Sequence, residues 1–157
     1  MSRMKTVIAG GLLAGALDIA DAFLFWGIRA GVKPMRIGQS IAGGVMGEAA
    51  SRGGWGTFAV GMALHFAMAV VMAVVFFEIC KRVTVVARHA LVFGALYGAG
   101  LYLVMTYLVV PLSLAQVGQN PKFPPDLNVV LLNTLFCHVV LVGLVVAWFS
   151  KRALRTA

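Results

Sequence analysis

The sequence predicts an all-α, polytopic membrane protein that forms a single domain over residues 1–157. Hydrophobic residues make up 61% of the chain, charged residues only 11%, and the mean hydropathy is +0.96. Soluble domains carry about a quarter charged residues, so this composition excludes an ordinary soluble domain, a disordered chain and a disulfide scaffold. Four apolar stretches are also long enough to cross about 30 Å of hydrocarbon as helices.

The four predicted spans cover residues 6–28, 57–80, 89–110 and 127–149. The first also has the features of a cleavable signal peptide, because Arg3 and Lys5 precede an apolar run that reaches small residues. The apolar run continues beyond them through Ile28, which gives it a length suited to a span. We therefore expect a membrane-spanning first helix.

The first external loop, residues 29–56, contains an apolar and glycine-rich segment over about residues 35–50. This segment is too short to span and predicts an interfacial or re-entrant helix. Its polar residues Gln39, Ser40 and Glu48 are the external-loop candidates. The helix could cover the polar residues of the bundle as a lid, or it could pack at the interface and seal the end of the bundle.

The net charge of +8 comes from basic residues at the ends of the apolar runs, which is typical of topology-setting charge and not of a nucleic-acid surface. If the N-terminus is inside, eight basic residues lie in short cytoplasmic segments and five in longer external loops. We therefore expect both termini to be cytoplasmic and no nucleic-acid partner. Cys80 and Cys137 lie in apolar segments without close spacing and are expected to be small buried hydrophobes.

Ionisable residues inside a span cost free energy unless they are paired or hydrated, so they are the first functional candidates. The first span contains Asp18 and Asp21. At 100° per residue they share one side of the helix with Gly11, Ala14 and Gly15, and this small and acidic stripe should face the bundle. Gly11-x-x-x-Gly15 and Gly94-x-x-x-Gly98 predict close helix contacts.

Polar residues of all four spans come at similar depths, about 9–16 Å below the outer face. If each points inward, they form a polar intramembrane cluster of Asp18, Asp21, His65, Tyr102, Asn133 and His138. The depths alone do not fix which way each residue points.

Three interpretations of this cluster stay open. In a structural role, Asp18 accepts hydrogen bonds from His138, Tyr102 or a backbone amide and fixes helix register. In a proton-linked role, carboxyl and imidazole groups exchange protons in a polar pocket. In a metal site, His65 and Asp21 are the candidate ligands, although no H-x-x-x-H or E-x-x-H pair occurs on one helix and every ligand would come from a different span. No cofactor is expected, and the different depths of His65 and His138 argue against axial haem ligation.

No nucleophile elbow, Walker loop, C-x-x-C or dinucleotide motif occurs. We therefore expect a non-enzymatic membrane protein, first as an accessory or partner-binding protein. The second hypothesis is a small proton- or ion-coupled transporter that uses Asp18, Asp21, His65 and His138, and intramembrane metal or haem binding is third. The expected partners are the lipid bilayer and either a second copy of the chain or another membrane protein.

The segment Pro34-Met35-Arg36-x-x-Gln39-Ser40-Ile41-Ala42-x-Gly44 and the later pieces Gly61-x-x-x-His65-Phe66 and Tyr102-Leu103-Val104-Met105 carry a resemblance. They are similar to a family of uncharacterised bacterial four-helix inner-membrane proteins, and the likeness covers nearly the whole chain. The resemblance implies a bacterial inner-membrane location but no named activity. Asp18 fits the pattern, whereas Asp21 stands where a neutral residue is expected, so the resemblance does not imply a two-carboxylate mechanism.

Overall fold

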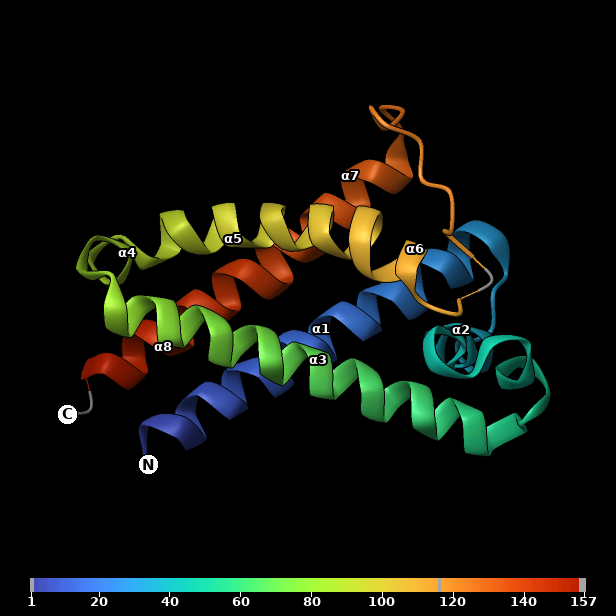
Figure 1. The fold of residues 1–157 in the computed structure, drawn as a ribbon, viewed down its shortest axis with the longest axis horizontal. Coiled ribbons are helices and arrows are strands. Elements are labelled where there is room, and N and C mark those ends of the chain that lie inside the picture. The colour runs from blue at the N-terminus through green and yellow to red at the C-terminus, as the bar shows by residue number, and fades with distance from the viewer. Residues whose placement is uncertain (1, 116, 156–157) are drawn as a thin grey trace.

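The computed structural model describes residues 2–115 and 117–155, in which helices and loops but no strands occur. Four helices are long and apolar enough to cross a membrane: Arg3–Ala30, Gly54–Arg82, Ala90–Leu112 and Val129–Arg155. This confirms the predicted all-α polytopic fold (Figure 1). The fourth helix begins later than the predicted residue 127 and continues beyond the predicted residue 149.

The first half of the chain contains α1 (Arg3–Ala30), α2 (Pro34–Met46), a 3-10 turn (Gly47–Arg52) and α3 (Gly54–Arg82). The short α4 (Thr84–Arg88) leads into the third span, which consists of α5 (Ala90–Val104), a π-helical segment (Met105–Val109) and α6 (Val110–Leu112). The fourth span consists of α7 (Val129–Phe136), a second π-helical segment (Cys137–Leu144) and α8 (Val145–Arg155).

The ends of the spans have local causes in the sequence. Ser2 caps α1 by accepting a hydrogen bond from the backbone N–H of Lys5, and Gly31 ends the helix with a φ of 64°. The side chain of Asn128 accepts from the backbone N–H of Leu131 at 3.0 Å and begins α7. These contacts satisfy backbone groups that a helix end leaves without partners.

Glycines allow the spans to pack closely, as both predicted glycine motifs require. A Cβ on Gly11 would lie 2.7 Å from Val70 Cα of α3, and one on Gly98 would lie 2.2 Å from the carbonyl oxygen of His138. α1 thus packs against α3, and α5 packs against the π-helical part of the fourth span. The helix contacts predicted from Gly11-x-x-x-Gly15 and Gly94-x-x-x-Gly98 are confirmed.

The two ends of the bundle differ in composition. Both termini lie at the end that carries α4, called here the α4 end, and α2 lies at the opposite, α2 end (Figure 1). The buried apolar core includes Val7, Phe76, Phe77 and Val146, which come from the halves of the spans nearer the α4 end. α3 and α7 diverge toward the α2 end.

The predicted interfacial segment is the α2 helix followed by the 3-10 turn, and it packs on α3. A Cβ on Gly61 would lie 1.9 Å from the carbonyl oxygen of Gly38, so the two backbones touch. The predicted range of 35–50 is corrected in one respect. The α-helix ends at Met46 because Gly47 has a φ of 57°, and the following residues continue as the 3-10 turn.

Candidate functional site

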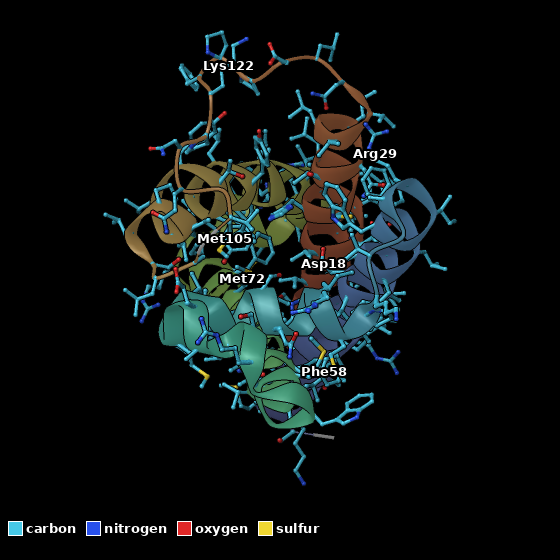
Figure 2. All side chains as sticks on the ribbon, turned by 90° about the vertical axis from the view of Figure 1, so that its right-hand side faces the viewer. Asp18, Arg29, Phe58, Met72, Met105 and Lys122 are labelled. Carbon is cyan, nitrogen blue, oxygen red and sulfur yellow. The ribbon has the colours of Figure 1, made fainter. Side chains whose placement is uncertain are left out.

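The acidic stripe of α1 faces the bundle, as its spacing predicts. Gly11, Ala14 and Gly15 are buried, and Asp18 and Asp21 are half-buried. The opposite side of α1 exposes its large residues: Leu13, Leu17 and Leu24. Figure 2 shows Asp18 in the interior of the bundle, whereas Arg29 and Lys122 lie at its outside.

Asp18 lies beside His65 of α3. Its Oδ2 atom is 4.0 Å from His65 Nε2, and the two side chains are 26% and 15% exposed. His65 Nε2 is also 2.9 Å from the carbonyl oxygen of Gly15, one turn before Asp18. Because a carbonyl oxygen can only accept, this nitrogen carries the hydrogen, and the other ring nitrogen has no hydrogen-bond partner among the described residues.

Asp18 lacks the hydrogen bonds expected of a purely structural residue. Among the residues that the structure describes, none donates a hydrogen bond to its carboxylate, and its contact with His65 is longer than a hydrogen bond. The expected partners His138 and Tyr102 instead contact each other. The predicted hydrogen bonds from His138, Tyr102 or a backbone amide are therefore wrong, because α1 turns Asp18 toward α3.

Asp21 has a different set of partners, on the fourth span. Its Oδ2 atom accepts hydrogen bonds from Asn133 Nδ2 at 2.7 Å and from the thiol of Cys137 at 2.9 Å. Asn133 and Cys137 are one helical turn apart and are themselves 3.6 Å apart at Nδ2 and Sγ. This arrangement links α1 to the fourth span through a carboxylate with two donors.

His138 and Tyr102 form a third contact, between the fourth and third spans. Their rings meet edge to face, with centroids 6.0 Å apart. His138 Nδ1 donates to the carbonyl oxygen of Thr134 at 2.9 Å, so this imidazole also has one nitrogen without a partner among the described residues. Tyr102 is 7% exposed and also meets Tyr107 edge to face, with ring centroids 6.2 Å apart.

The predicted cluster is thus three local contacts: Asp18 with His65, Asp21 with Asn133 and Cys137, and His138 with Tyr102. The first two share α1, and the third lies between the third and fourth spans. The second and third contacts adjoin on the fourth span, because Cys137 of the second is followed directly by His138 of the third. The six residues lie in one region and do not converge on one point.

Sequence reasoning missed one member of this site. Cys137 is buried as expected, but it also donates to Asp21, which the expectation of an inert hydrophobe did not include. Its position one turn after Asn133 was the available signal. Both Cys137 and His138 belong to the π-helical segment, and such segments are frequent at functional sites.

The external-loop residues have structural contacts at the α2 end. Gln39 is 5% exposed and donates from Nε2 to the carbonyl oxygen of Gly54 at 3.3 Å and to Thr57 Oγ1 at 3.4 Å. Ser40 and Glu48 are exposed, and Ser40 donates to the carbonyl oxygen of Ile37 at 2.8 Å. Gln39 therefore fixes α2 to α3 and is not presented to the polar cluster.

The weak metal candidates His65 and Asp21 have separate partners. Within residues 2–115 and 117–155, no group of three or more histidine, cysteine, aspartate or glutamate side chains is arranged to hold a metal ion. The chemistry that the arrangement offers is proton exchange between carboxyl and imidazole groups.

Comparison of the chain with protein-family models, with curated protein sequences and with solved structures finds no match. The polar residues and their contacts are therefore the basis for a functional proposal.

Proposed function

We propose that this chain is a small, non-enzymatic, proton- or ion-coupled transporter in which Asp18 and His65 hold the exchangeable proton. The observation that carries the proposal is the Asp18 carboxylate, which is placed inside a span with His65 at 4.0 Å and with no hydrogen-bond donor among the described residues. Placing an ionisable group inside a membrane costs free energy. A purely structural contact offsets that cost through hydrogen bonds, which Asp18 does not make with the described residues.

The arrangement of His65 supports proton exchange. Its Nε2–H is directed to the Gly15 carbonyl oxygen, so a proton can add at Nδ1 without breaking that bond. The resulting positive charge would lie 4.0 Å from Asp18 and would stabilise its ionised form. The pair can therefore hold one proton in either of two places, which is the property that coupling needs.

We further propose that the chain lies in a bacterial inner membrane with both termini in the cytoplasm. The support is the distribution of basic residues, of which eight lie in segments of the α4 end and five in segments of the α2 end. Short basic segments decide orientation, and they occur at the α4 end. A single four-helix bundle has little volume for alternating access, so we expect a homo-oligomer.

Proton flux into vesicles tests the transport proposal. The purified chain is reconstituted with a pH-sensitive dye inside, and a potential is applied. We expect flux above that of empty vesicles, and we expect Asp18→Asn to reduce it to the empty-vesicle level because the amide cannot ionise. Asp126→Asn is the matched control, since Asp126 is 64% exposed in the third loop, and it should keep full flux. Equal flux for the intact chain and Asp18→Asn would overturn the proposal.

An accessory or partner-binding protein is the second candidate, and the contacts of Asp21 favour it. Its carboxylate has two donors from the fourth span, as in a polar contact that sets helix register. For such a protein no variant would carry flux, and the intact chain would co-purify with another membrane protein. Co-purification without flux would favour this second function over the first.

A further inference from the structure

A second polar feature lies at the α2 end, outside the cluster that the transport proposal uses. It is a cavity of about 450 Å³ bounded by α2, by the 3-10 turn and by Val117, which lies between α6 and α7. The residues that line it include the basic Arg36 and Arg52 and the acidic Glu48.

The charges that line this cavity do not neutralise one another. In the part of the chain that the structure describes, no carboxylate oxygen lies within 4.0 Å of either guanidinium group. At the α4 end, by contrast, Glu78 pairs with Lys81 at 2.6 Å. Two positive charges and one negative charge therefore line one cavity as separate groups, which suits a ligand that carries both signs of charge.

Arg36 is held in place by the fold. Its Nη1 atom donates to the carbonyl oxygen of Ser51 at 3.2 Å and to Gln39 Oε1 at 3.4 Å. Gln39 is 5% exposed and is itself fixed by Gly54 and Thr57 of α3. The Nη2 and Nε hydrogens of Arg36 have no partner among the described residues and remain for a ligand, and a guanidinium oriented in advance binds phosphate with little further ordering.

The cavity lies where lipid headgroups would reach it. Val45 and Met46 at the end of α2 and Trp55 at the start of α3 expose large apolar surfaces. Exposed tryptophan next to a span is typical of the headgroup level of a membrane. The cavity is lined by residues of the segment between Met46 and Trp55 and by α2, so it opens close to that level.

We propose that this cavity binds a phosphate ester that carries a primary ammonium group, as in a phosphoethanolamine headgroup. Arg36 and Arg52 contact the phosphate, and Glu48 contacts the ammonium. A simple anion would leave Glu48 next to like charge, whereas the zwitterion gives each of the three groups an opposite partner. The same chemistry is offered by a membrane phospholipid and by free phosphoethanolamine.

Lipid binding by the purified full-length chain tests the proposal. Native mass spectrometry in detergent compares phosphatidylethanolamine with phosphatidylglycerol of the same acyl chains. We expect the intact chain to prefer phosphatidylethanolamine, and Arg52→Gln to weaken its binding about tenfold, the effect of losing one charge-assisted hydrogen bond. The side chain of Arg52 makes no hydrogen bond or ion pair with the described residues, so this variant should fold normally. Arg29→Gln, a change at an exposed cation outside the cavity, should leave binding unchanged.

Glu48→Gln tests the ammonium part separately. It should remove the preference for phosphatidylethanolamine over phosphatidylglycerol while leaving binding of the phosphate intact. Competition by soluble phosphoethanolamine would assign the free ester as the ligand, and lipid binding that it does not reduce would assign the headgroup. Unchanged binding in both Arg36→Gln and Arg52→Gln, or a preference that survives Glu48→Gln, would overturn the proposal.

Discussion

Asp18 and Asp21 are one turn apart on α1, yet their surroundings differ. Asp21 accepts two hydrogen bonds from the fourth span, whereas Asp18 has only His65 at 4.0 Å. The difference follows from direction, because successive residues of a helix are 100° apart and three residues turn the side chain to another neighbour. At the residue scale, therefore, one carboxylate makes a hydrogen-bonded contact between helices, and the other has no hydrogen-bond donor among the described residues.

Replacing Asn133 should destabilise the bundle through Asp21. Asn133→Ala removes the 2.7 Å hydrogen bond, and we expect a loss of about 1 kcal/mol in the free energy of unfolding, the usual size for such contacts in membranes. Unfolding in mixed detergent measures it, and a double-mutant cycle with Asp21→Ala isolates the pair. Thr134→Ala is the control, because Thr134 donates within its own helix, to Val130. A coupling energy near zero for the Asn133 cycle would contradict the prediction.

Cys137 should tolerate serine better than valine. A serine hydroxyl keeps a donor for Asp21, whereas valine fills similar space and leaves the carboxylate with Asn133 alone. We expect Cys137→Val to lower the unfolding temperature in detergent more than Cys137→Ser does. The same pair of changes at Cys80 should give the opposite order, because Cys80 is buried in the apolar core and its thiol has no polar contact among the described residues. If serine and valine rank in the same order at both cysteines, then burial, and not the hydrogen bond to Asp21, determines the change in unfolding temperature.

At the scale of elements, hydropathy predicted the four spans because each must cover its length in apolar residues. Glycine spacing predicted their close contacts, because a glycine has no side chain to keep two helix backbones apart. The two π-helical segments were not predicted, because their extra residue per turn follows from packing between spans. Cys137 was missed with them, since its contact to Asp21 depends on how the fourth span meets α1.

The contact of α5 with the fourth span should fail when Gly98 gains a side chain. Its Cβ would lie 2.2 Å from a backbone carbonyl oxygen, which cannot move aside, so the helices must separate. We expect Gly98→Ala to cost about 1–3 kcal/mol in the free energy of unfolding. Gly100→Ala is the matched control on the same span, since no atom lies within 4 Å of its added Cβ, and it should be neutral or stabilising. Equal effects at the two glycines would contradict the close contact.

At the scale of the whole molecule, apolar packing and polar contacts occupy different parts of the bundle. The large buried residues come from the halves of the spans nearer the α4 end, whereas the residues of the polar contacts come from the halves nearer the α2 end. The sequence placed the six polar residues at one level, since depth depends only on position along each span. It could not assign their partners, because these depend on the rotation of each helix about its axis, which contacts between distant parts of the chain determine.

The distribution of basic residues predicts that the α4 end is cytoplasmic, and cysteine labelling can test this for the whole molecule. Ser51 and Thr84 are exposed at the α2 and α4 ends respectively, so each can carry a single cysteine in a chain with Cys80→Ala and Cys137→Ser. We expect a membrane-impermeant maleimide to label Ser51→Cys in intact cells that lack an outer membrane, and Thr84→Cys only after permeabilisation. The parent without cysteines controls for background. Labelling of Thr84→Cys alone in intact cells would reverse the orientation and place the cavity of Arg36 and Arg52 in the cytoplasm, because both ends are fixed by the same four spans.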